Sequence, residues 1–152
     1  NRIGGPGVSV IVTTSAGEAA SLSESEAAKG RKVVLVGMSR GTIDVASAIA
    51  SGAKADGVVL VSGAYDNVRA TLGAPSALPR TLLVHHRNDE CNSTPPAAAA
   101  SFIAWSGGKA YVSWISNRGS LVPNPCGPRG AHGFFMKDGA AVSAINGFIR
   151  SR

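Results

Sequence analysis

The stretch Val33-Val-Leu-Val-Gly37-Met-Ser39-Arg-Gly41-Thr decides how this sequence is interpreted. Four apolar residues typical of a buried strand lead into a G-x-S-x-G motif, and an amphipathic helical pattern follows. This context predicts a sharp, strained strand-to-helix turn that lifts the Ser39 hydroxyl above a sheet. The first amides of the following helix can then stabilise an oxyanion. We therefore interpret Ser39 as a nucleophile; in the alternative interpretation, the turn is an ordinary corner whose serine only caps the helix.

Five apolar runs predict the strands around this turn. They are Val8–Val12, Lys32–Val36, Val58–Val61, Thr81–Val84 and the more mixed Ala110–Ile115. Runs of β-branched residues and leucine that do not alternate with polar residues indicate strands covered on both faces. Such strands are typical of a parallel sheet.

Helical patterns fill the gaps between these runs. They cover Glu18–Ala28, Thr42–Ser51, Pro96–Trp105 and Ala140–Ile149. Because strand and helix alternate, a stack of right-handed βαβ units is expected. A chain of 152 residues suits one domain with one core. The expected fold is α/β, a three-layer sandwich with a mainly parallel sheet spanning residues 1–152.

A serine hydroxyl is a poor nucleophile unless a base removes its proton, and histidine is the usual base. The sequence has three histidines. His132 lies in a loop among small residues, after the last expected strand. His85 and His86 stand at the end of an expected strand, where a structural role is the expectation. His132 is therefore the candidate base for Ser39.

The base in turn needs a carboxylate to orient it. Asp89 stands just beyond the carboxyl end of the strand that begins at Thr81. Carboxyl ends of parallel strands share one edge of a sheet, so this acid is expected near the strand-to-helix turn. Glu90, beside it, and Asp66, one strand earlier, are the competing candidates.

Three elements of the chain together resemble the α/β-hydrolase superfamily. They are the turn Gly37–Gly41, the acid loop His86–Asp89 and the histidine loop Gly130–Phe134. They span most of the chain and correspond to the second half of the usual fold. The resemblance implies Ser39 as nucleophile, His132 as general base and then acid, and Asp89 as its orienting acid. The implied activity is that of a carboxylesterase-like serine hydrolase that works through an acyl-enzyme.

The resemblance also implies an oxyanion hole. One donor would be the Arg40 amide, and the other an amide of the loop after an earlier strand, Thr14 or Ser15. The family usually has several strands before the turn, whereas this chain has one expected strand there. This departure indicates a pared-down sheet, or N-terminal strands supplied by a missing segment or a second chain.

The two cysteines are Cys91 and Cys126. Free buried thiols in a cytosolic protein are one interpretation, and a disulfide in an exported protein is the other. Placed on the resemblance, Cys91 lies just past the acid and Cys126 six residues before the histidine. A bridge would tie the two loops together, as in some secreted cutinase-like and polyester-degrading relatives. We expect the disulfide, and with it a secreted or periplasmic protein rather than a cytoplasmic one.

The connection from Val61 to Thr81 is too short for a helical cap domain. An open site follows, suited to small soluble esters or to the exposed surface of a polymeric ester. Tyr65, Phe134 and Trp105 are the candidates to line it, with a place in the core as the equal alternative for each. Neither H-E-x-x-H nor a Cys/His ligand set is present, and we expect no metal and no cofactor.

The net charge of +6 at pH 7 raises the question of nucleic-acid binding. Lys29, Arg31 and Lys32 form the one tight basic group, and a solvated surface is expected because DNA binding needs a concentrated stripe. No apolar run approaches a membrane span. Two other classes compete with an enzyme: a non-catalytic hydrolase-like binding or scaffold protein, and a flavodoxin-like or nucleotide-binding module. Against the second class, this sequence contains no G-x-G-x-x-G motif.

Overall fold

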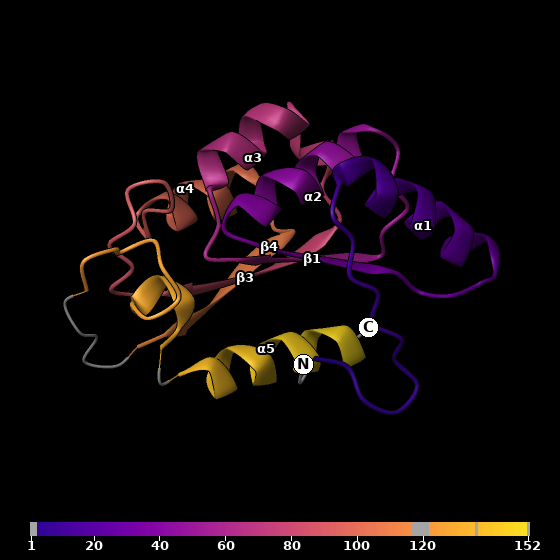
Figure 1. The fold of residues 1–152 in the computed structure, drawn as a ribbon. Coiled ribbons are helices and arrows are strands. Elements are labelled where there is room, and N and C mark those ends of the chain that lie inside the picture. Colours follow the sequence, from indigo (N-terminus) through magenta and orange to yellow (C-terminus); the bar gives the residue numbers. More distant parts are fainter. Residues whose placement is uncertain (1–2, 117–121, 136, 152) are drawn as a thin grey trace.

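A computed structural model describes residues 3–116, 122–135 and 137–151 of the chain. Within these residues the sheet has four strands in the order β1-β2-β3-β4, and each neighbouring pair is parallel (Figure 1). The strands are β1 (Val34–Met38), β2 (Gly57–Val61), β3 (Arg80–His86) and β4 (Ala110–Ile115). The helices are α1 (Ala16–Ala28), α2 (Arg40–Ala50), α3 (Tyr65–Leu72), α4 (Ala98–Trp105) and α5 (Asp138–Arg150), with 3-10 turns η1 (Pro75–Ala77) and η2 (Ala131–Gly133). The expected α/β fold with a parallel sheet is confirmed.

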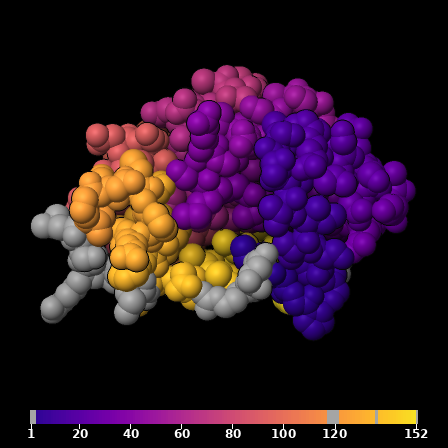
Figure 2. Space-filling view, in the orientation of Figure 1, coloured from indigo at the N-terminus to yellow at the C-terminus, as the bar shows by residue number. Residues whose placement is uncertain are grey.

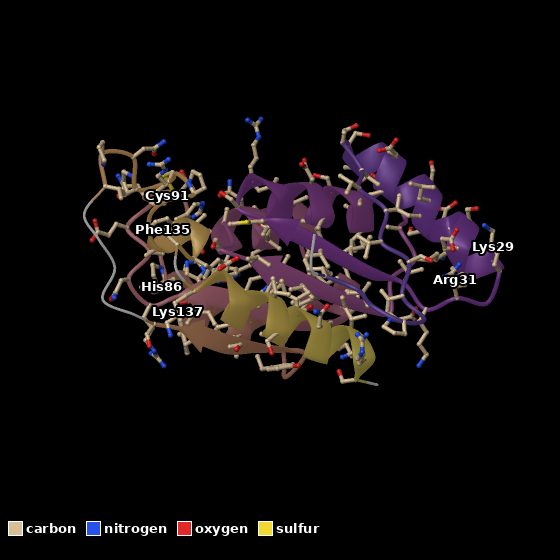
Figure 3. All side chains as sticks on the ribbon, turned by 60° about the horizontal axis from the view of Figure 1, so that its bottom comes forward. Lys29, Arg31, His86, Cys91, Phe135 and Lys137 are labelled. Carbon is tan, nitrogen blue, oxygen red and sulfur yellow. A yellow bond between two sulfur atoms is a disulfide. The ribbon has the colours of Figure 1, made fainter. Side chains whose placement is uncertain are left out.

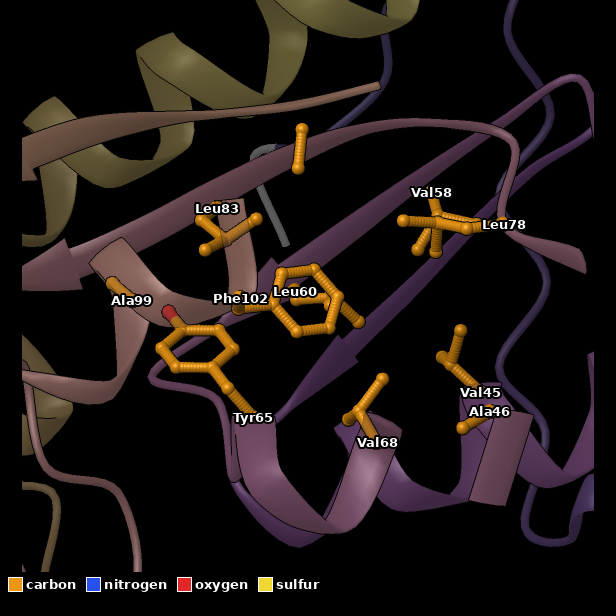
Figure 4. Close-up of a cluster of buried hydrophobic side chains, with 11 residues drawn as sticks. Val45, Ala46, Val58, Leu60, Tyr65, Val68, Leu78, Leu83, Ala99 and Phe102 are labelled. Carbon is orange, nitrogen blue, oxygen red and sulfur yellow. The ribbon is translucent and has the colours of Figure 1, made fainter. Parts of the chain in front are cut away.

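The sheet is the middle of three layers. Helices α1 to α4 cover one face and α5 covers the other (Figure 1). Along β2, Val58 and Leu60 belong to the core beneath the first group of helices, which Figure 4 shows. Val59 and Val61 belong to the second core, against α5. Because both faces are buried, the run has no polar positions.

Most elements follow the sequence pattern, but their ends differ. Strand β1 begins at Val34 rather than Lys32 and continues to Met38. Helix α3 was not among the predicted helices. It has eight residues, of which Tyr65 and Val68 are buried, too few to make an apolar stripe in the sequence.

The prediction of a strand at Val8–Val12 is wrong. Here Val8 makes one isolated bridge to Gly5, and residues 10–12 are 46–80% exposed. A strand needs a neighbour that takes its backbone hydrogen bonds. This segment instead runs past β1, from the α5 side of the sheet to the start of α1 (Figure 1).

Strand β1 consequently lies at the edge of the sheet. Among the described strands it pairs with β2 alone. Its residues Val36 and Met38 are 40% and 45% exposed, although they continue a strand whose other residues are better covered. The edge therefore presents apolar side chains, and among the described strands none pairs with its outward backbone groups.

Candidate active site

The turn between β1 and α2 has the backbone expected for an exposed nucleophile. Ser39 has φ 56° and ψ −118°, a region that costs a residue with a side chain free energy. A Cβ on Gly37 would collide with the Gly41 carbonyl and with Val45. Position 37 therefore requires glycine. A Cβ on Gly41 would meet nothing within 4 Å, so close packing does not explain the second glycine of the motif.

Hydrogen bonds on both sides hold this turn in place. The Ser39 amide donates to the Val61 carbonyl at 2.8 Å. The Thr42 hydroxyl donates to the Ser39 carbonyl at 2.6 Å and accepts from the Ala64 amide at 3.2 Å. The strained residue is thus tied both to β2 and to the loop that follows it.

The Arg40 amide stands at the first position of α2. The first four amides of a helix have no partner within the helix, and the helix dipole makes this end favourable for negative charge. An oxyanion beside Ser39 would find this donor close by. The Arg40 assignment stays a prediction.

The residues predicted as the second oxyanion donor cap another helix. The Ser15 hydroxyl accepts from the Glu18 amide at 3.1 Å, and the Thr14 amide donates to the Glu18 carboxylate at 2.9 Å. Together these bonds form a cap at the start of α1. Thr14 would have to give up its bond to Glu18 to stabilise an oxyanion, and the second donor stays a prediction.

Three side chains that are far apart in the sequence meet at the carboxyl edge of the sheet. The Nε2 atom of His132 lies 2.9 Å from the Ser39 hydroxyl oxygen, and its Nδ1 atom lies 3.0 Å from Asp89 Oδ2. His132 is 3% exposed. In the space-filling view, residues 122–135, which include this histidine, lie beside the purple residues of the turn and α2 (Figure 2).

The Asp89 carboxylate is buried and accepts several hydrogen bonds. Its Oδ1 accepts from the Cys91 amide at 2.9 Å. Its Oδ2 accepts from the Thr94 hydroxyl at 2.9 Å and from His85 Nε2 at 2.9 Å, in addition to the contact with His132. Burial by itself would raise the pKa of Asp89. Hydrogen bonds from the two imidazoles and from the backbone outweigh it, and the pKa falls well below its usual range.

The competing acids lie outside this arrangement. Glu90 is exposed next to Asp89, and Asp66 is exposed in the first turn of α3. The geometry therefore favours Asp89 as the partner of His132.

The predicted disulfide is confirmed. Cys91 and Cys126 are bonded, with their Cα atoms 4.7 Å apart. Because the Cys91 amide donates to Asp89, the bridge joins the backbone that holds the acid to the loop before His132.

Tyr65 and Phe134 do not line an open site as predicted. Tyr65 is 0% exposed and Phe134 is 3% exposed. Tyr65 packs against Phe102 in the core under α3 and α4, as Figure 4 shows, and Phe134 belongs to the core against α5. Aromatic residues near a sheet edge bury readily in the core, and the sequence carries no pattern that would separate the two locations.

The sequence did not predict the buried groups that hydrogen-bond to His132 and Asp89. Ser62 and Thr94 are buried and both bond to His132. His85, for which the sequence predicts a structural role, contacts the acid. The one signal available was the placement of His85 at the end of the strand that leads to Asp89.

The tight basic group lies elsewhere. Lys29 and Arg31 form ion pairs with Glu26 at the opposite end of the molecule from Cys91 and His86 (Figure 3). In the described part of the chain, no three His, Cys, Asp or Glu side chains gather as a metal site would require. None of the helices described here is long and apolar enough to cross a membrane.

Comparison with known proteins identifies the fold. No protein-family model matches the sequence, and no curated protein does. A solved structure described as a predicted CIB-like hydrolase from Thermoplasma acidophilum is similar, with a TM-score of 0.60 and 19% identity over 89% of this chain and 59% of that one. TT1662 from Thermus thermophilus is also similar, with a TM-score of 0.53 and 16% identity over 85% of this chain and 59% of that one.

This chain therefore spans 59% of the length of each of these structural neighbours. At such identities the likeness concerns the fold alone. This likeness agrees with the parallel sheet and its flanking helices described above. The chain has an α/β-hydrolase-type fold.

Proposed function

We propose that the protein is a serine hydrolase that cleaves carboxylic esters, with Ser39 as nucleophile, His132 as base and Asp89 as orienting acid. One observation carries this proposal. His132 Nε2 lies 2.9 Å from the Ser39 hydroxyl, and His132 Nδ1 lies 3.0 Å from Asp89 Oδ2. This is the arrangement that activates a serine. A structural neighbour described as a predicted hydrolase supports the general class of activity.

The reaction follows from these contacts. As the Ser39 oxygen attacks the ester carbonyl carbon, its proton passes to His132 Nε2, and the carbonyl oxygen becomes an oxyanion stabilised by the Arg40 amide. The carbon–oxygen bond to the alcohol then breaks, and His132 returns the proton to the departing alcohol. A water molecule, deprotonated by His132, attacks the acyl-enzyme and releases the acid and free Ser39.

The short connection between β2 and β3 supports an open site. It contains α3, of eight residues, and the 3-10 turn η1, too little chain for a cap over the serine. Small soluble esters and the exposed ester groups of a polymer are the substrates that this site would accept. The disulfide supports a secreted or periplasmic location, since such bonds persist in oxidising compartments.

The open edge of β1 supports a further part of the proposal. Exposed Val36 and Met38 lie where an additional strand would pair, whether from a preceding segment or from a second chain. Such a strand would also bring loops to the carboxyl edge of the sheet. One of those loops is an alternative source for the second oxyanion donor.

Labelling with a fluorophosphonate probe tests the proposal directly, because the probe reacts with an activated serine. We expect intact mass to rise by one probe adduct and the labelled peptide to contain Ser39. Ser39→Ala is the control and should remain unlabelled. A folded wild-type protein that takes up no probe and hydrolyses no activated short-chain ester would support the non-catalytic binding or scaffold function instead.

A further inference from the structure

A second imidazole contacts the same oxygen of the acid as His132 does. The His85 Nε2 atom lies 2.9 Å from Asp89 Oδ2 and 2.9 Å from the Thr94 carbonyl oxygen. Its Nδ1 atom lies 2.7 Å from the Tyr65 hydroxyl. His85 and Tyr65 are both 0% exposed, so water does not compete for these bonds.

The partners determine where the protons are. Nε2 of His85 faces two acceptors, a carboxylate and a carbonyl, so this nitrogen carries a proton. In the neutral ring, Nδ1 is then an acceptor and takes its bond from the Tyr65 hydroxyl. Burial raises the pKa of Tyr65, which keeps the phenol protonated and able to donate. The proton on Nε2 is therefore held toward Asp89 by a hydroxyl on the far side of the ring.

We propose that Tyr65 and His85 are positioning residues that orient the Asp89 carboxylate for His132. The inference rests on the proposed function, because positioning has a kinetic effect only if the serine is a nucleophile. The order of contacts is Tyr65 hydroxyl, His85, Asp89, His132 and Ser39 hydroxyl, and each step is a distance of 3.0 Å or less.

The contacts to both oxygens of Asp89 prevent its carboxylate from rotating. Oδ2 is the oxygen that His132 uses, and it also receives His85 and the Thr94 hydroxyl, while Oδ1 is held by the Cys91 amide. Without the His85 bond, one donor to the charged oxygen is lost. Misplacement of a catalytic group by a fraction of its contact distance slows the chemical step rather than substrate binding.

The packing around Tyr65 allows its hydroxyl to be removed with little change to the ring contacts. Its ring packs at a tilt against Phe102 and His85, with ring centroids 5.5 Å and 5.4 Å away. Tyr65→Phe keeps these contacts and removes only the hydroxyl. It releases Nδ1 of His85 from its donor, so the ring can move its proton away from Asp89. Tyr111, which is 53% exposed, provides the matched control Tyr111→Phe.

Kinetics on an activated short-chain ester should separate the variants. For Tyr65→Phe we expect kcat to fall several-fold with KM unchanged. For His85→Leu we expect kcat to fall about 10-fold or more, because this variant loses a hydrogen bond to a charged group. His85→Gln can still donate an N–H to Asp89 and should recover most of the rate. Tyr111→Phe should equal wild type.

Two results would overturn the inference. One is an unchanged kcat in Tyr65→Phe. This variant is the milder change, so it tests the inference even if His85→Leu does not fold. The other is a His85→Gln rate as low as that of His85→Leu, which would assign His85 to core packing alone. Thermal unfolding of each variant shows whether a slow enzyme is a folded one.

A proton NMR measurement separates this inference from the proposed function. The His132 Nδ1 proton bonded to Asp89 should resonate far downfield, shift in Tyr65→Phe and stay in place in Tyr111→Phe. If wild type neither hydrolyses esters nor takes the probe, the proposed function fails, while this resonance still reports on positioning. A resonance unmoved in Tyr65→Phe would contradict the positioning role.

Discussion

The Ser62 hydroxyl donates a hydrogen bond to the His132 carbonyl oxygen at 2.7 Å. Ser62 directly follows β2, is fully buried and has φ 48°. Its amide donates to the Val84 carbonyl at 2.8 Å. The backbone of the histidine loop is therefore fastened to the centre of the sheet, on the strand next to the serine turn.

Ser62→Ala should reduce both stability and activity. The substitution leaves the buried His132 carbonyl without this donor, at a cost of about 1–3 kcal/mol in the free energy of unfolding, and loosens the imidazole. Denaturant titration and ester hydrolysis measure the two effects. The matched control is Ser23→Ala, because Ser23 is also buried and donates to a carbonyl, that of Ala20. It should lose stability and keep its rate; equal rate losses in both variants would contradict the interpretation.

Ser39→Ala should abolish turnover, by about 10⁴-fold or more if the serine is the nucleophile, without unfolding the protein. A second variant tests the backbone. Because Ser39 has φ 56°, Ser39→Gly should relieve strain and be more stable than Ser39→Ala by about 1 kcal/mol. Ester hydrolysis and denaturant midpoints give both quantities. Turnover that persists in Ser39→Ala would point to another nucleophile.

The two glycines of the G-x-S-x-G motif should respond differently to alanine. Gly37→Ala places a methyl group against the Gly41 carbonyl and Val45 and should cost about 1–3 kcal/mol or more. Gly41→Ala meets open space and lies in α2, where alanine favours the helix. Thermal unfolding of the two variants checks the order. A Gly37→Ala protein as stable as wild type would contradict the close approach described here.

Breaking the disulfide should destabilise the protein and disturb the acid. The bridge spans 35 residues, for which chain-entropy estimates give about 3–4 kcal/mol. The double variant Cys91→Ser/Cys126→Ser should unfold at lower denaturant and hydrolyse esters more slowly, because Cys91 also donates its amide to Asp89. Reductant should mimic this in wild type and leave the double variant unchanged. Equal stability with and without reductant would sink this prediction.

The lowered pKa of Asp89 predicts how stability depends on pH. Below its unfolded pKa of about 4, the unfolded chain takes up a proton that the folded protein still excludes. The stability from this group is thus complete above about pH 4 and is lost as pH falls toward the folded pKa. Denaturation of Asp89→Asn should depend less steeply on pH in this acid range than that of wild type. Identical slopes would show that Asp89 is not the group responsible.

The sequence was a good guide where the information is local. The run before Gly37 and the run from Thr81 both became strands. The second is buried on both faces, as a continuous apolar run predicts, whereas the first lies at the sheet edge with Val36 and Met38 exposed. The Val8–Val12 run is similarly rich in β-branched residues but forms no strand, because pairing depends on a neighbouring strand and not on the run itself. Helix α3 escaped prediction because two buried residues make no readable stripe.

From the sequence alone came the alternation of strand and helix, the glycine and serine of the strained turn, and the three side chains that meet at the sheet edge. These follow from residue type and order, which govern local backbone conformation and the edge at which each strand ends. Only the tertiary structure decided that Tyr65 faces the core, that His85 bonds the acid and that Ser62 holds the histidine loop. Those contacts depend on which buried side chains face one another across separate strands, and that is settled by packing of the whole chain.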